Sequence, residues 1–231
     1  MNANGSARTM RAGSSVFDRY RHSEWMEDEM KVALIGASGK AGSRVLKELA
    51  DRGHEVTALV RNPDNVADLP GVSAVAVTGD GSDLADKIAG HDAVISSVRF
   101  VDLDPDVLLP AIKASGVKRY LVVGGAGSLM HPDGVIEVEQ PGFPDVAKPN
   151  SIRGGYLLDQ LKASEGLDWT YLSPPRMFVP GERTGTFRYG KDDMLMKDGA
   201  PTSISFEDFA LALVDELEKP EHTGERFTIG Y

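Results

Sequence analysis

KVALIGASGKAGSRVLKELADRGHEVTALVRNP, residues 31–63, is the stretch of sequence that decides the fold. An apolar run, Lys31–Ile35, leads at once into three glycines spaced G-x-x-G-x-x-G. A helical pattern follows, and a second apolar run, Glu55–Val60, completes the unit. This order is typical of a strand, a glycine-rich turn, a helix and a second, parallel strand.

Each glycine of the turn has its own physical role in such a unit. Gly36 permits the tight turn off the strand, Gly39 lets the backbone approach a pyrophosphate, and Gly42 lets helix and strand pack closely. The amides near Lys40 and Ala41 would then face the anion at the helix N-terminus. The alternative is a glycine-rich turn that serves packing alone.

Composition limits the classes of partner. The chain has 231 residues, of which 41% are apolar and 26% charged, and this is enough for one hydrophobic core. Its formal net charge of −10 disfavours nucleic acid and anionic membranes as partners, since both would be repelled. The absence of cysteine excludes disulfides and thiolate metal sites and is compatible with a reducing compartment. We expect a cytoplasmic protein with no metal site that binds neither membranes nor nucleic acid.

Residues 1–30 differ from the rest of the chain. They have no sustained hydrophobic period and mix four arginines with five acidic residues. We predict a leader that is disordered or tag-like. An organelle transit peptide is the alternative, although its acidic residues, Asp18 and Glu27–Glu29, count against it.

From residue 31 onward, short apolar runs alternate with helical stretches. Helix ends are marked by Gly53, by Asp104 followed by Pro105, and by Gly116. The pattern predicts a single α/β domain, residues 31–231, with a doubly wound parallel sheet buried on both faces and a small C-terminal region on the substrate side. The predicted strands are Lys31–Ile35, Glu55–Val60, Val72–Val77, Ala93–Ser97, Tyr120–Val123 and Trp169–Leu172.

Several further segments carry a family resemblance. They are VTGDGSD, AVISSVRF, GVKRYLVVGGAGSL, GLDWTYLSPPRMF and the C-terminal ISFEDFALALVDELEKPEHTGERFTIGY. With the glycine turn and GHEVTALVRNP, they resemble the atypical short-chain dehydrogenase/reductase superfamily over residues 30–231. Within it the chain is similar to the NADH-flavin reductase-like group, with biliverdin-IXβ reductase-like and NmrA-like proteins as relatives. The resemblance implies an NAD(P)-binding Rossmann fold and leaves the substrate open.

Arg61 bears on the choice of cofactor. Enzymes selective for NAD usually place an acidic residue near the end of the second strand, where it binds the ribose 2′-hydroxyl. A guanidinium suits a 2′-phosphate instead. Arginines in the same LVR context bind NADPH in the related reductases, and the resemblance extends this role to Arg61, assisted by Ser38 or Lys40. We therefore expect NADP(H) in preference to NAD(H), with an ordinary exposed arginine as the alternative.

The resemblance also places residues at the two ends of the cofactor. Asp80 would lie beside the adenine, and Ser97 and Val98 would border the nicotinamide half. For Asp80 a turn is an equal alternative, since GDGSD is rich in turn-forming residues.

The catalytic pattern departs from that of the superfamily. Active short-chain dehydrogenases carry a lysine four residues after the catalytic tyrosine, and its charge lowers the pKa of the phenol. Tyr156 has Gln160 at this spacing, and Lys162, six residues on, faces another side of a helix. Tyr156 would therefore be a poor general acid, or it lines the pocket. Ser128 lies in the region of the superfamily's serine and would orient a substrate carbonyl or cap a turn.

A substrate pocket is expected from two loops, one after the fifth strand and one after the sixth. Its candidate residues are Met130, His131, Arg176, Met177 and Phe178. Met and Phe side chains can stack on a planar acceptor, and a core role is the alternative for each. His131 is either exposed or an acid.

Three functions are compatible with these features. The first is an NAD(P)H-dependent oxidoreductase that transfers hydride to a flavin-like, quinone-like or other conjugated small molecule, a reaction that needs no Tyr/Lys pair. The second is an NmrA-like sensor that binds NADP(H) without turnover. The third is a sugar-type epimerase or isomerase. We expect a monomer or a homodimer.

Overall fold

The computed structural model describes residues 29–231. The prediction of a leader over residues 1–30 therefore lies outside the described residues, apart from its last two. Met30 already belongs to the domain, because its side chain packs on the core and its carbonyl accepts a hydrogen bond from the Glu55 amide at 3.0 Å. The packed domain thus includes a residue that lies outside the predicted range 31–231.

An eight-stranded sheet forms the centre of the domain, in the order β3-β2-β1-β4-β5-β6-β12-β8. All neighbours are parallel except β12 and β8. This arrangement confirms the predicted doubly wound sheet. The strands are β1 (Lys31–Ile35), β2 (Glu55–Val60), β3 (Val72–Ala76), β4 (Ala93–Ser96), β5 (Arg119–Val123), β6 (Asp168–Ser173), β8 (Arg188–Gly190) and β12 (Glu225–Gly230).

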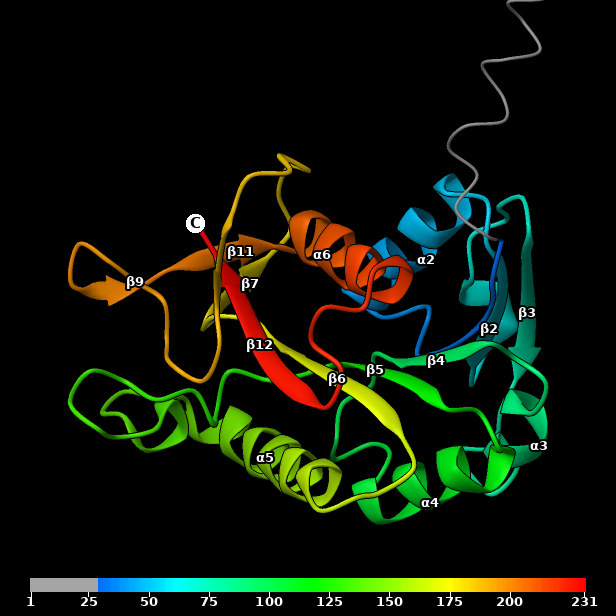
Figure 1. The fold of residues 1–231 in the computed structure, drawn as a ribbon, viewed down its shortest axis with the longest axis horizontal. Helices are drawn as coiled ribbons and strands as arrows, with labels where there is room; N and C mark the ends of the chain where they lie inside the picture. Colours follow the sequence, from blue (N-terminus) through cyan, green and yellow to red (C-terminus); the bar gives the residue numbers. More distant parts are fainter. Residues whose placement is uncertain (1–28) are drawn as a thin grey trace, which may run out of the picture.

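Helices cover both faces of the sheet (Figure 1). One face packs on α2 (Gly42–Asp51) and α6 (Phe206–Glu218), and the other packs on α3 (Leu84–Ile88), α4 (Pro105–Ser115) and α5 (Lys148–Lys162). Alternate residues of each central strand enter opposite cores: Val32 and Leu34 pack with the first group, and Ala33 and Ile35 with the second. This double burial explains why the strands read as unbroken apolar runs.

The edge strand β3 is an exception to the predicted burial on both faces. Ser73, Ala74 and Ala76 are exposed, and the other two residues of the strand are half-buried. β3 has a neighbour, β2, on one side only, and its short side chains leave it thinly covered.

Several short elements complete the fold. β7 (Met177–Val179) pairs with β11 (Ser203–Ser205), and β9 (Met196–Lys197) pairs with β10 (Ala200–Pro201). Three single 3-10 turns lie at Pro63–Asn65, Glu137–Glu139 and Asp145–Ala147. Figure 1 shows the green loop after β5 and the orange β9 region at the same end of the molecule.

Helix ends follow the predicted signals. The Asp104 carboxylate accepts a hydrogen bond from the Asp106 amide at 2.8 Å and caps α4, whose first residue is Pro105. Gly116 ends this helix with a φ of +81°, and Gly53 follows α2 with a φ of +86°.

No helix within residues 29–231 combines the length and the apolar character needed to cross a membrane.

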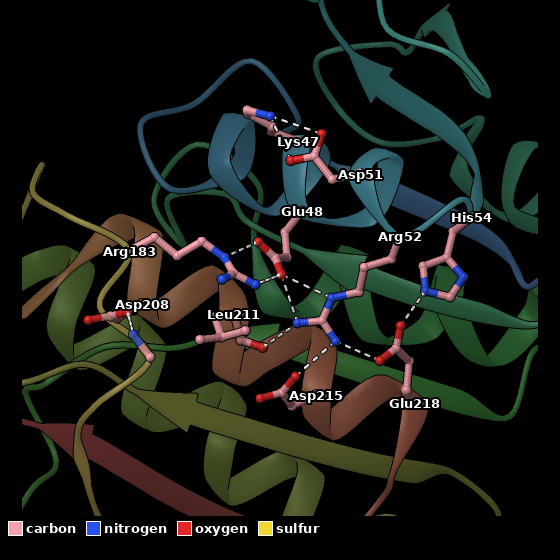
Figure 2. A network of polar contacts seen from close by, with 11 residues as sticks. Lys47, Glu48, Asp51, Arg52, His54, Arg183, Asp208, Leu211, Asp215 and Glu218 are labelled. Atoms are coloured by element: carbon pink, nitrogen blue, oxygen red, sulfur yellow. Dashed lines mark hydrogen bonds and ion pairs between the residues drawn. The ribbon is translucent and has the colours of Figure 1, made fainter. Parts of the chain in front are cut away.

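A charged network joins α2 to α6 (Figure 2). Glu48, only 6% exposed, accepts hydrogen bonds from Arg52 at 2.7 Å and from Arg183 at 2.7 Å. Arg52 also reaches Glu218 at 2.6 Å, and the buried His54 contacts the same carboxylate at 2.9 Å. Each of these charges has a partner, which offsets the desolvation cost of burying it, so the network joins the two helices as one paired unit.

Candidate functional site

The glycine turn brings three backbone segments into direct contact. Gly36 has a φ of +83°, and a Cβ at this residue would lie 2.3 Å from the Ser97 carbonyl oxygen. A Cβ at Gly42 would lie 2.2 Å from the Gly36 carbonyl oxygen. Both positions therefore require glycine for packing. Gly39 is different, because it is exposed and a Cβ there would lie 3.3 Å from the Gly36 oxygen, a tight contact but not an overlap. The main effect of its missing side chain is to leave the outer surface of the turn open to a ligand.

The N-terminus of α2 has no internal cap. Ala41, at the N-cap position, makes no side-chain hydrogen bond. Within the described part of the chain, the amides of Lys40, Ala41 and Gly42 have no hydrogen-bond acceptor. Free amides at a helix start are donors ready for an anion such as a phosphate.

A cavity of about 280 Å³ opens beside this turn, at the carboxyl ends of β1, β2, β3 and β4. It lies where the strand order reverses between β1 and β4, the position at which open α/β sheets bind ligands. The cavity brings together the predicted residues Gly36, Ser38, Gly39, Arg61, Ser97 and Val98.

The cavity also contains residues that the sequence reasoning missed. Val60, Val77, Thr78 and Gly79 form part of its wall. Val60 is the last residue of β2 and the other three directly follow β3, and this position was the available signal, because strand ends meet at one edge of a parallel sheet. Arg99, which follows β4, adds a second guanidinium.

Arg61 is the cation best placed to receive a ligand. Its side chain lines the cavity and is exposed, and it makes no hydrogen bond or ion pair with any residue between 29 and 231. Arg99 is different, because it pairs with Asp102 at 3.7 Å. A free guanidinium on the wall that Ser38 and Gly39 also line, in a chain of net charge −10, is suited to bind an anion. The turn, the amides and Arg61 therefore fit the phosphates of a dinucleotide.

Asp80, which the resemblance places beside the adenine, makes the hydrogen bonds of a turn. It is absent from the cavity wall, and its carboxylate accepts hydrogen bonds from the Ser82 amide at 3.1 Å and the Ser82 hydroxyl at 2.9 Å. Short acidic side chains stabilise turns in this way. These hydrogen bonds favour the turn interpretation of Asp80, and Thr78 and Gly79, directly before it, line the cavity.

Tyr156 lies on α5, outside the cavity wall, and its hydroxyl faces a carboxylate rather than a cation. The phenol donates to Asp106 at 2.8 Å, and Gln160 donates to the phenol oxygen at 2.8 Å. The Asp106 carboxylate is the main cause of a raised pKa for Tyr156, and partial desolvation adds to it. Arg153 lies over the ring at 4.7 Å from its centre rather than at the hydroxyl. This environment opposes a catalytic phenol, whose pKa would be lowered.

Ser128 is also outside the cavity wall. Its hydroxyl oxygen accepts a hydrogen bond from Arg226 of β12 at 2.9 Å. Arg226 is 5% exposed and is held by Asp192 at 2.6 Å. The arginine occupies the oxygen of Ser128 and leaves its hydrogen free to donate, so Ser128 keeps the capacity to orient a carbonyl but has no contact with the cofactor cavity.

Two of the predicted pocket residues meet at a buried carboxylate. Glu137 is fully buried, and one of its oxygens contacts His131 Nε2 at 2.6 Å while the other accepts a hydrogen bond from Arg176 Nε. His131 is therefore only 10% exposed, which corrects its interpretation as an exposed residue. Met130 is half-buried and lies next to this cluster, where its amide and carbonyl pair with the loop at residues 192–194.

Phe178 is half-buried and packs against the core, which favours its core role over stacking on an acceptor. Its ring lies 4.5 Å from that of Phe206 and 4.7 Å from that of Phe209. Met177 is the neighbour in β7 and points the other way, with 52% of its surface exposed. The alternation of side chains along a strand separates the two residues.

Among residues 29–231 no group of three or more His, Asp or Glu side chains is arranged to hold a metal ion.

Comparisons with known proteins agree with this geometry. The sequence profile of the NAD(P)H-binding family matches residues 36–220. YwnB of Bacillus subtilis, an uncharacterized protein, is 38% identical over 211 residues, which cover 87% of this chain and 98% of YwnB.

Solved structures show the same relationship. A candidate epimerase from Bacteroides thetaiotaomicron is 38% identical, with a TM-score of 0.82 and coverage of 88% of this chain and 98% of that one. A candidate NADH-flavin reductase from Streptococcus pneumoniae is 34% identical, with a TM-score of 0.70 and coverage of 87% and 99%. The chain therefore belongs to the NAD(P)H-binding family.

Proposed function

We propose that this protein is an NADPH-dependent reductase of planar, conjugated small molecules such as flavins or quinones. The observation that carries the proposal is the environment of Tyr156, whose hydroxyl donates to Asp106 at 2.8 Å and has Gln160 in place of a lysine. Reduction of a simple carbonyl needs a positioned acid, and this phenol is poorly suited to be one. A conjugated acceptor removes that need.

The chemistry asks little of the protein beyond positioning. Bound NADPH would supply the hydride, and a conjugated ring would spread the resulting charge so that solvent can provide the proton. The chain's own residues would bind the two molecules and keep their reacting faces together. Gly36, Gly39 and Gly42 would hold the pyrophosphate side, and Ser97 and Val98 would border the nicotinamide.

The preference for NADPH over NADH rests on Arg61. Its guanidinium lines the cavity and is not paired with any described residue, so a ribose 2′-phosphate would meet a charge that no internal carboxylate neutralises. Ser38, on the same wall, can add a hydroxyl donor. The candidate NADH-flavin reductase among the relatives supports a reductase of this type but does not bear on the choice between the two cofactors.

A spectrophotometric assay tests the proposal. Purified protein is mixed with NADPH and an excess of FMN or menadione, and the absorbance of reduced nicotinamide is followed. We expect oxidation that requires both the protein and the acceptor. Tight binding of NADPH without oxidation by any acceptor would refute the reductase and favour the alternative, an NmrA-like sensor of NADP(H), which the altered Tyr156 site also permits.

An epimerase is the second alternative, and the Bacteroides thetaiotaomicron relative is a candidate member of that class. Epimerisation of a sugar requires a group that moves a proton at carbon or oxygen, and the raised pKa of Tyr156 counts against this residue in that role. Exchange of deuterium from solvent into a nucleotide sugar, in the absence of any other acceptor, would favour the epimerase over the reductase.

A further inference from the structure

The buried carboxylate of Glu137 is not used by the cofactor cavity or by the function proposed above. It lies in the loop after β5 and is fully buried, yet both of its oxygens are occupied, one by His131 and one by Arg176. A buried carboxylate is costly unless it is paired, so the three side chains form one unit. The unit holds Arg176 in a fixed position.

The bonding of Arg176 leaves part of its guanidinium free. Only Nε is used, since it donates to Glu137, and within the described part of the chain neither terminal nitrogen has a hydrogen-bond acceptor. The side chain is 32% exposed, and its charge lies 5.9 Å from the ring centre of Phe143. Arg176 thus presents a fixed fork of donors next to an aromatic ring, a combination suited to an acidic group on a planar molecule.

Arg176 also lies at the carboxyl ends of the strands, where the cofactor cavity opens. It follows β6, and β5 separates β6 from β4, whose end leads to Ser97 and Val98 in the cofactor cavity. With neighbouring strands about 4.8 Å apart, the ends of β4 and β6 are separated by about 10 Å. A ring system beside the nicotinamide that carries a short acidic side chain can span this distance.

We infer that Arg176 is a specificity-determining residue that binds an acidic substituent, a phosphate or a carboxylate, of the acceptor. Glu137 and His131 are positioning residues, because they orient the guanidinium and do not themselves contact the acceptor. This inference rests on the proposed function for the planar character of the acceptor. The requirement for an acidic group is additional to it.

Binding measurements with two matched pairs of probes test the inference without turnover. FMN and riboflavin share one ring and differ by a phosphate, and anthraquinone-2-carboxylate and its carboxamide differ by a negative charge. Each is titrated by calorimetry into protein saturated with NADP⁺. We expect the acidic member of at least one pair to bind about tenfold more tightly, the scale of one charge-assisted interaction. The pair with the larger ratio identifies phosphate or carboxylate as the group bound.

Two variants locate the effect. Arg176→Gln should abolish the preference for the acidic member and leave the affinity for riboflavin and for NADPH unchanged. The double variant Arg176→Gln with Glu137→Gln should behave in the same way, and it leaves no unpaired charge in the core if the single variant folds poorly. Lys197→Gln is the matched control: this exposed cation, at the same end of the molecule, has no side-chain partner among the described residues.

The outcomes separate this inference from the proposed function. A lack of preference in both pairs, or a preference that persists in Arg176→Gln, would overturn the inference even if flavins are reduced. A loss of NADPH affinity in Arg176→Gln would also overturn it, since the residue would then serve the cofactor. Preference that depends on Arg176, in a protein that oxidises no NADPH, would support the inference and refute the reductase.

Discussion

Replacing Arg61 by alanine should weaken the binding of NADPH and leave that of NADH nearly unchanged. The guanidinium has no ion pair or hydrogen bond with any described residue. Its removal therefore leaves no internal carboxylate unpaired and should not alter the free energy of unfolding. The whole effect then falls on the ligand. A charge-assisted hydrogen bond is worth about 1.5–3 kcal/mol, and the lower half of this range applies because Arg61 is exposed to solvent. We therefore expect NADPH affinity to fall about 13- to 45-fold.

Fluorescence titrations of both cofactors against the wild type, Arg61→Ala and Arg61→Lys provide the test. Lysine keeps the charge but loses the planar fork, so it should retain part of the preference. The melting temperature serves as the control for folding. Equal losses for NADPH and NADH in Arg61→Ala would show that the residue contacts a part common to both cofactors, and the assignment of a 2′-phosphate site would be wrong.

Three other perturbations test the turn, the tyrosine and the charged network. Gly42→Ala should lower stability by about 1–3 kcal/mol, because its Cβ would lie 2.2 Å from a carbonyl oxygen, whereas Gly39→Ala should weaken NADPH binding with little change in thermal unfolding. Tyr156→Phe should lower kcat for flavin reduction less than about tenfold, and a thousandfold fall at neutral pH would make Tyr156 a catalytic acid. Glu48→Gln should cost about 3 kcal/mol in urea unfolding at pH 7. Burial raises the pKa of the Glu48 carboxyl, but hydrogen bonds from Arg183 and Arg52 outweigh it and lower this pKa below its ordinary value of 4.5. The stabilisation is therefore complete above pH 4.5 and is lost as the pH falls through the folded-state pKa, and the variant should show a smaller difference between pH 7 and pH 3.

The strands could be predicted from the sequence because burial on both faces leaves a direct record in it. All six predicted parallel strands are present, and their ends differ from the predicted ones by no more than one residue. The exception in burial is instructive. β3 contains as many apolar residues as a central strand. Three of its five residues, however, are the small residues Ser73, Ala74 and Ala76, and these lie exposed at the sheet edge. Side-chain size, rather than apolar character, distinguished the edge from the centre.

The sequence leaves the role of a site residue open where one residue type serves two purposes. Phe178 was a candidate for stacking on an acceptor, yet it packs against Phe206 and Phe209 because β7 turns it toward the core. Asp80 matched a position beside the adenine, yet it stabilises its own turn through Ser82. In both cases the side chain is chemically suited to either role, and only the local backbone direction decides between them.

The cofactor side can be predicted from the sequence better than the proposed acceptor side. The reason is the number of residues that separate the contacting side chains along the chain. The cofactor side depends on Gly36, Gly39, Gly42 and Arg61, which one strand–helix–strand unit brings together, so its chemistry can be predicted from a single short stretch. The acceptor side depends on pairs that are far apart in sequence: Arg176 and Glu137 are separated by 39 residues, and Ser128 and Arg226 by 98. No spacing rule links such pairs, because intervening loops change length without disturbing the sheet. The specificity of the proposed acceptor side therefore has to be sought in such long-range pairs, and the pair of Arg176 with Glu137 leaves both terminal guanidinium nitrogens without an acceptor among the described residues.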